Sequence, residues 1–181
     1  TTLLTTTNPI MKKAFTIMSL VAAFAGIATA GDKYVVEKNP VSVVAPCYGA
    51  GYEFGIFGAG FIPDDSSGYD DSLGGGVSVG YFFNENLGLD ASAAWYATDS
   101  VVHNYNVDAV YRLPFDCIAP YIFGGGGLHT NSHTEGLARL GGGVDVRFAD
   151  GMSVFADGAY NWVGGDIENY TTVRAGLRFA F

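Results

Sequence analysis

The 181-residue chain has few positive charges and no long apolar run. Nine lysines and arginines stand against 18 aspartates and glutamates, which gives a formal net charge of −9 at pH 7. This balance argues against nucleic-acid binding, which depends on basic side chains that neutralise phosphates. No stretch approaches the roughly 20 continuous apolar residues that a membrane-spanning helix needs. Any membrane-spanning part of this chain must therefore consist of strands.

The beginning of the chain carries the pattern of a processing signal. A basic pair, Lys12 and Lys13, precedes a short apolar run and a small-x-small triplet that ends at Ala30. This order is typical of a secretory signal peptide that is cleaved before Gly31. We expect residues 1–10 to be an upstream extension that is not native and residues 11–30 to be the signal peptide. Residues 31–48 are then a periplasmic segment, and residues 49–181 form the barrel domain.

Alternation of apolar with polar or small side chains recurs eight times in the folded part. In the last nine residues, Val173, Leu177 and Phe181 share one face of a strand, whereas Arg174 and Arg178 share the other. Each segment approaches the 9–11 residues of a tilted membrane-spanning strand. The pattern predicts an all-β fold, an eight-stranded antiparallel up-and-down transmembrane β-barrel. The expected strands lie near residues 50–62, 74–83, 87–97, 101–113, 119–128, 136–148, 152–163 and 169–181.

The connections between these segments alternate in kind. Short turns are expected at 84–86, 114–119 and 149–151. Longer or more polar connections are expected at 63–73, 98–100, 129–135 and 164–168. Outer-membrane barrels pair short periplasmic turns with longer external loops. We therefore expect both termini of the barrel to lie in the periplasm.

Charged side chains within the strands all fall on one parity. An arginine that faces lipid is costly, so this parity predicts a polar interior. The expected lumen ion network contains Glu53, Asp90, Asp108, Arg112, Arg139, Asp145, Arg147, Asp157, Arg174 and Arg178. Shared parity alone suggests pairs such as Glu53 with Arg139 and Asp145 with Arg178. Eight strands enclose a space just wide enough for side chains to fill, which favours a plugged lumen.

The two cysteines, Cys47 and Cys117, both fall on the expected periplasmic side, where disulfides form. A bond between them requires the segment 31–48 to lie across the barrel opening as a strap. The alternative is two free thiols, because the sequence does not show whether the Cα atoms come within bonding range.

A polar stretch near residue 130 contains the candidate ligating and catalytic side chains. His129, His133 and Glu135 form a weak candidate set for a metal ion, and Ser132 adds a candidate nucleophile. The alternative is a solvated outer loop without chemistry. We expect no catalytic residue, no cofactor and no metal in this protein.

Several segments carry a family resemblance. The turn at 82–89, the glycine-rich segment 119–128 and the terminal aromatic strand resemble the OmpA-like outer-membrane β-barrel superfamily, which includes opacity-type surface proteins. The resemblance implies a location in the outer membrane of Gram-negative bacteria, with lipid and lipopolysaccharide as neighbours. It also implies that Phe179 and Phe181 form the signal that the barrel-assembly machinery recognises. We expect no appended peptidoglycan-binding domain.

These observations predict a monomeric outer-membrane protein that is not an enzyme. Its expected role is structural, in the integrity of the outer membrane, or surface-interactive, with adhesion through acidic outer loops, and its surface ligand is not identified. A narrow porin-like channel for small solutes or ions is the alternative. A lipid-modifying enzyme is a more remote alternative, because it needs a serine and a histidine together at the level of the lipid.

Overall fold

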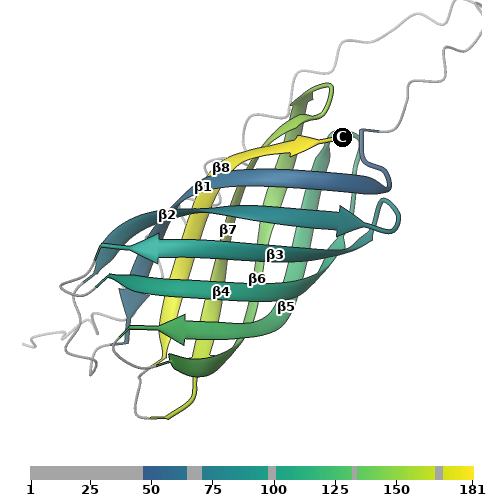
Figure 1. The fold of residues 1–181 in the computed structure, drawn as a ribbon. Coiled ribbons are helices and arrows are strands. Elements are labelled where there is room, and N and C mark those ends of the chain that lie inside the picture. The colour runs from purple at the N-terminus through teal and green to yellow at the C-terminus, as the bar shows by residue number, and fades with distance from the viewer. Residues whose placement is uncertain (1–46, 65–70, 98–100, 132–133, 166–168) are drawn as a thin grey trace, which may run out of the picture. The chain divides into compact units, whose positions relative to one another are not determined.

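The computed structural model describes residues 47–64, 71–97, 101–131, 134–165 and 169–181. The described residues form eight strands that close into one antiparallel barrel (Figure 1), which confirms the predicted fold. The strands are β1 (Gly51–Pro63), β2 (Ser72–Phe82), β3 (Leu87–Tyr96), β4 (Val102–Arg112), β5 (Ile118–Thr130), β6 (Thr134–Ala149), β7 (Met152–Val163) and β8 (Tyr170–Ala180). No helix in the described part of the chain is long and apolar enough to cross a bilayer. The predicted extension and signal peptide lie outside the described residues.

The strands connect by short turns at one end of the barrel, which we call the turn side. The opposite end is called the loop side. In the β2–β3 turn, the side-chain oxygen of Asn84 accepts hydrogen bonds from the backbone N–H groups of Asn86 and Leu87, each at 2.8 Å. Such a side chain replaces a backbone partner and tightens the turn. In the β6–β7 turn, Gly151 has a φ of 70°, which glycine adopts without strain.

The connection between β5 and β6 is shorter than the sequence predicted. Residues 129–135 were expected to form a loop, but His129 pairs with Glu135 and Thr130 pairs with Thr134 in the strand ladder. The sequence did not predict these strand ends because their side chains are polar. Alternation with apolar residues is required only within the apolar part of the membrane. The hairpin continues beyond that level.

The register of the strands winds around the barrel. A path from Glu53 that crosses every strand through paired residues returns to β1 at Pro63, ten residues further along. This offset is the shear of the barrel, which accompanies the tilt of the strands. As a result, residues paired along the sheet lie at different heights along the barrel axis.

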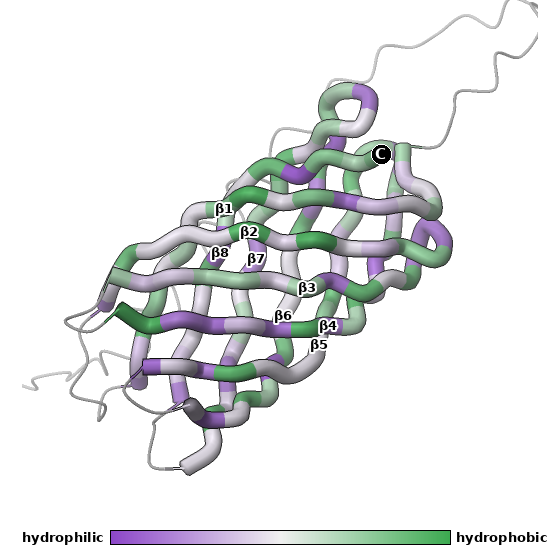
Figure 2. The backbone as a smooth tube through the Cα atoms, viewed as in Figure 1, coloured by the Kyte–Doolittle hydropathy of each residue, from purple (hydrophilic) through white to green (hydrophobic). Residues whose placement is uncertain are grey.

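Apolar side chains cover the outside of the barrel. Figure 2 shows hydrophobic and hydrophilic residues alternating along the strands. Val107, Ile122 and Leu140 are more than half exposed, as lipid-facing side chains are in the absence of lipid. At the turn side, exposed aromatic rings contact one another and form an aromatic belt: Tyr52, Tyr81, Phe83 and Phe181. Such belts are typical of outer-membrane barrels at the membrane interface.

Glycines inside the barrel make room for large rings. A Cβ at Gly76 would lie 2.6 Å from the ring of Phe57, and a Cβ at Gly141 would lie 2.5 Å from the ring of Phe123. Both rings are buried in the lumen. The glycines therefore leave room for these rings inside the barrel.

Candidate functional site

The ten charged side chains predicted for the lumen all point into the barrel. Arg112 and Asp145 have no exposed surface and Asp108 is 1% exposed. The most accessible of the ten is Arg147, at the turn side, with 12% of its side chain exposed. Five arginines against five carboxylates make the formal charge of this set zero. The structure thus gathers the residues that alternation assigned to one face.

Glu53 is the centre of a charged layer near the turn side. Its Oε1 atom lies 3.0 Å from Nη1 of Arg112 and 3.0 Å from Nη2 of Arg147. Its Oε2 atom lies 3.7 Å from Nε of Arg178, which also donates a hydrogen bond to Asp145. Because β1 is not adjacent to β4 or β6, the bonds of Glu53 cross the interior. This layer therefore links β1 to β4, β6 and β8 through side chains inside the barrel.

A second group lies deeper in the barrel. Arg174 donates from Nε and Nη2 to the two oxygens of Asp157, at 2.8 and 2.9 Å. The hydroxyl of Tyr121 donates to the same carboxylate at 2.7 Å. Two parallel bonds between a guanidinium and a carboxylate are among the strongest charged contacts in proteins. Nearby, Nε of Arg139 lies 3.2 Å from Oδ1 of Asp108.

The individual ion pairs differ in part from those suggested by parity. Asp145 and Arg178 are paired, as suggested, but Glu53 and Arg139 are not, because Arg139 pairs with Asp108. The register explains the difference. Arg139 lies on the path that starts at Glu53, and that path climbs the barrel as it crosses five strands. Equal parity places two residues inside but does not place them at one height.

Aromatic rings pack against the guanidinium groups. The Cζ atom of Arg112 lies 3.7 Å from the ring centre of Phe82, and that of Arg178 lies 4.4 Å from the ring centre of Phe155. Arginine suits this position because its planar group can stack on a ring while its edge binds carboxylates. Both rings are buried and fill space between the charges.

An aromatic layer of Phe61, Tyr96 and Tyr170, which we call the Phe61 layer, lies in the lumen at the loop side. The ring of Phe61 lies 5.4 Å from that of Tyr96 and 4.5 Å from that of Tyr170. Asn104 donates a hydrogen bond of 2.8 Å to the hydroxyl of Tyr170. Tyr96 is 2% exposed inside the barrel, although an aromatic side chain near a strand end would also suit the membrane interface. Its neighbour Trp95 faces outward, so strict alternation would have placed Tyr96 inside.

His129 does not lie in a solvated loop. It belongs to β5, is 2% exposed, and its Nδ1 atom lies 3.3 Å from the hydroxyl of Tyr170. Glu135 is its register partner on β6, and His133 lies outside the described residues. Among the described residues, the ligand atoms of Cys47, Asp116 and Cys117 come close enough for one metal ion. The two sulfurs are bonded to each other, so that group lacks free thiolates.

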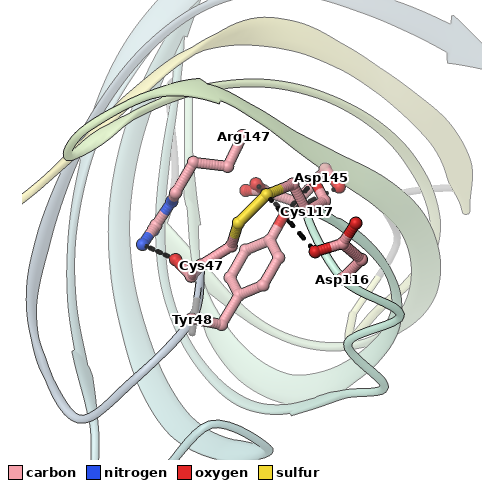
Figure 3. Close-up of a disulfide and its surroundings, with 6 residues drawn as sticks. All are labelled: Cys47, Tyr48, Asp116, Cys117, Asp145 and Arg147. Carbon is pink, nitrogen blue, oxygen red and sulfur yellow. Dashed lines mark hydrogen bonds between the residues drawn. A yellow bond between two sulfur atoms is a disulfide. The ribbon is translucent and has the colours of Figure 1, made fainter. Parts of the chain in front are cut away.

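The cysteines form a disulfide at the turn-side mouth of the barrel (Figure 3). Cys47 and Cys117 have Cα atoms 5.2 Å apart and join the residues before β1 to the turn between β4 and β5. The next residue, Tyr48, is 1% exposed and its hydroxyl lies 3.0 Å from a carboxylate oxygen of Asp145. The sequence pattern did not predict a buried position for Tyr48. Its place directly after Cys47 could have indicated one, because a disulfide at Cys47 holds the next residue at the barrel mouth.

Two guanidinium groups hold the ring of Tyr48. The Cζ atoms of Arg112 and Arg147 lie 4.5 and 4.7 Å from the ring centre. Arg147 also donates a hydrogen bond to the carbonyl oxygen of Cys47. Burial raises the pKa of the Tyr48 phenol, and the negative charge of Asp145 raises it further. The phenol is therefore held in its neutral form, as a hydrogen-bond donor.

The terminal aromatic residues lie on the outside of the barrel. Phe181 is 79% exposed, and its backbone N–H donates to the carbonyl of Tyr52 at 3.0 Å. Its ring lies 6.3 Å from the ring of Tyr52. Phe179 is the register partner of Phe54 on β1. The last residues thus complete the closure of the sheet between β8 and β1.

The sequence matches the outer membrane protein β-barrel domain family over residues 19–181. The chain belongs to this family. Membership places the barrel in the outer membrane of bacteria, and it agrees with the lipid-facing exterior. No curated protein matches the sequence.

Three solved structures show how widely this fold is shared. Neisserial surface protein A has 20% identity and a TM-score of 0.64, with 74% of this chain and 99% of that chain covered. The N-terminal barrel of Pseudomonas aeruginosa OprF has 19% identity and a TM-score of 0.57, with 73% and 99% covered. The outer membrane enzyme PagL has 15% identity and a TM-score of 0.50, with 70% and 99% covered. Such similarity shows the fold alone.

Proposed function

We propose that the protein is a non-conducting, monomeric outer-membrane barrel with a structural or surface role. The network of buried ion pairs inside the barrel is the observation that carries this proposal. Ion pairs and hydrogen bonds between non-adjacent strands occupy the lumen near the turn side and in the middle, and the Phe61 layer occupies the loop side. Side chains such as Arg112 and Asp108 leave almost no surface that a water molecule could reach.

A channel would require these layers to separate. Opening a path past Glu53 means breaking its contacts with Arg112 and Arg147 while all three groups remain inside the barrel. Removing one partner from a buried ion pair costs about 3–5 kcal/mol, so spontaneous opening of several pairs is rare. The geometry therefore favours a plugged scaffold over a diffusion pore.

The conductance of a planar bilayer tests this proposal. The full chain, refolded in detergent and inserted, should give no steady current above that of the lipid. Arg139→Ala and Arg178→Ala shorten side chains in different lumen layers and serve as comparison variants. A steady wild-type current that either substitution alters would show a water-filled lumen and make the protein a channel.

The fold leaves an enzymatic role open, because PagL shares it. The two described histidines do not support one. His129 is buried against Tyr170, and Nδ1 of His103 has no hydrogen-bond partner among the described residues. A catalytic histidine needs a group that fixes its ring and a nucleophile within reach. We propose that the barrel has no hydrolytic activity.

A surface role draws on the connections at the loop side. The segments predicted as outer loops contain no lysine or arginine and eight acidic residues: Asp64, Asp65, Asp70, Asp71, Asp99, Glu135, Asp166 and Glu168. Such a rim favours a basic partner, or a divalent cation shared with lipid phosphates. We propose that the turn side faces the periplasm, which places this acidic rim at the cell surface.

A further inference from the structure

The disulfide and the ring of Tyr48 form one unit at the turn-side mouth. Tyr48 follows Cys47 directly, so the bond to Cys117 fixes where its side chain can lie (Figure 3). The ring lies against the layer of Arg112 and Arg147, and the hydroxyl reaches Asp145 inside the barrel. No other residue of the described N-terminal segment, 47–50, is buried in this way.

We propose that this disulfide is a redox latch that holds Tyr48 in the mouth of the lumen. In the oxidised protein the ring covers the charged layer. In the reduced protein the segment 47–50 leaves, and water enters as far as Arg147 and Arg178. The disulfide is then a site of redox modification. The reagent that reduces it is a dithiol, such as the exposed thiol pair of a thiol–disulfide oxidoreductase.

The hydrogen bonds of the Tyr48 hydroxyl add little to hold the segment without the covalent bond. The hydroxyl has one proton but three acceptors around it: the side chain and carbonyl of Asp145 and the carbonyl of Cys117, at 3.0, 3.0 and 3.1 Å. It can donate to only one of them at a time. Each hydrogen bond to the protein replaces one to water, whereas ordering the backbone has a full entropic cost. The disulfide removes most of that cost by tethering the segment.

The exchange reaction is accessible at this position. Both cysteines are partly exposed at the rim. A thiolate of the dithiol attacks one sulfur and forms a mixed disulfide, and its second thiol then displaces that sulfur. Two electrons pass to the cysteines and two protons complete their thiols, while the dithiol becomes a disulfide. Nothing else is consumed.

A cysteine placed behind Tyr48 reports whether the mouth is open. Ser153 is 1% exposed, faces the lumen and pairs in register with Arg147 and Arg178. We would introduce Ser153→Cys into the full chain, with the disulfide intact and with Cys47→Ser and Cys117→Ser. Alkylation by iodoacetate, a small charged reagent, is then followed by peptide mass mapping, which also verifies the disulfide. The reporter should react at least tenfold faster when the latch is absent.

Two further variants separate opening of the mouth from loosening of the barrel. Tyr48→Ala should expose the reporter even with the disulfide intact, because the ring is the cover. Ser78→Cys, 4% exposed at mid-lumen, should stay slow in every background. Equal rates at Ser153→Cys with and without the latch, fast reaction at Ser78→Cys, or failure of the disulfide to form would each overturn the proposal. If the serine variants do not fold, reduction of the folded protein gives the same comparison.

The latch and the closed lumen can fail independently. The Phe61 layer at the loop side does not depend on Tyr48, so the reduced protein should still conduct no current. A fast reporter in a silent bilayer supports both proposals. Current in both redox states, with the reporter rate unchanged, contradicts both.

Discussion

The bond between Asp157 and Arg174 offers the sharpest test of a dry, ion-paired interior. Asp157→Ala removes a carboxylate that receives two hydrogen bonds from Arg174 and one from Tyr121. The side chains of the ion pair are 1% and 7% exposed, so the arginine cannot turn to water. Loss of one partner of such a pair costs about 3–5 kcal/mol, because the other charge stays buried without compensation.

Two further variants divide this cost into its parts. Tyr121→Phe keeps the ion pair and removes one hydrogen bond to a charged group, which costs about 1.5–3 kcal/mol. Replacing both partners, with Asp157→Leu and Arg174→Met together, leaves no buried charge unpaired. Such double replacements are often neutral or stabilising by about 1–4 kcal/mol. We therefore expect the double variant to be more stable than Asp157→Ala.

The free energy of unfolding can be measured by urea titration of the barrel in lipid vesicles. Trp95 and Trp162 are 40% and 45% exposed on the outer face, so their fluorescence should report the loss of lipid contact on unfolding. A cost of less than about 1 kcal/mol for Asp157→Ala would contradict the reasoning, since water would then be solvating Arg174. Equal destabilisation in the single and double variants would contradict it as well.

Three other predictions concern single features of the barrel. Gly125→Ala should prevent folding, seen as loss of the gel shift between unheated and boiled samples, because a Cβ there would collide with the backbone of β4, whereas Gly136→Ala has open space and should be tolerated. Intact mass after alkylation should show no modified cysteine without reductant, and Cys47 and Cys117 both modified with it. The raised pKa of Tyr48 makes stability fall as pH rises above about 10, because the unfolded phenol ionises first; Tyr48→Phe should weaken that fall, measured by urea titration at several pH values.

The fold could be predicted because a membrane barrel imposes a strict rule on each strand. Lipid accepts no charge, so residues such as Arg174 and Arg178 must share a face, and their positions fix the parity of the whole strand. In the same way, Asp90 and Asp108 must face the lumen, and their positions fix which residues of β3 and β4 face inward. The strand segments and the side on which each residue lies therefore follow from local patterns alone.

The arrangement inside the barrel could not be predicted in the same way. Contacts across the lumen depend on the shear of the barrel. The shear is set by all eight strand pairings together, so no single strand segment of the sequence indicates it. Trp95 and Tyr96 show a second limit, since an aromatic pair at a strand end fits both an interfacial belt and an inward layer. His129 shows a third, because a polar strand beyond the apolar zone has the composition of a loop.

The register also explains why ion pairs span the lumen. Asp90 and Asp108 are direct partners on adjacent strands, an arrangement in which like charges repel. Neutralisation must then come from other strands, and Arg139 on β6 reaches Asp108 from two strands away. Glu53 likewise binds arginines on β4 and β6, besides Arg178 on the neighbouring β8. Asp157 has an arginine, Arg174, as its register partner, but Glu53, Asp90, Asp108 and Asp145 have no basic register partner. The arginines that bind Glu53, Asp108 and Asp145 therefore extend into the interior, where their side chains occupy space that a channel would need.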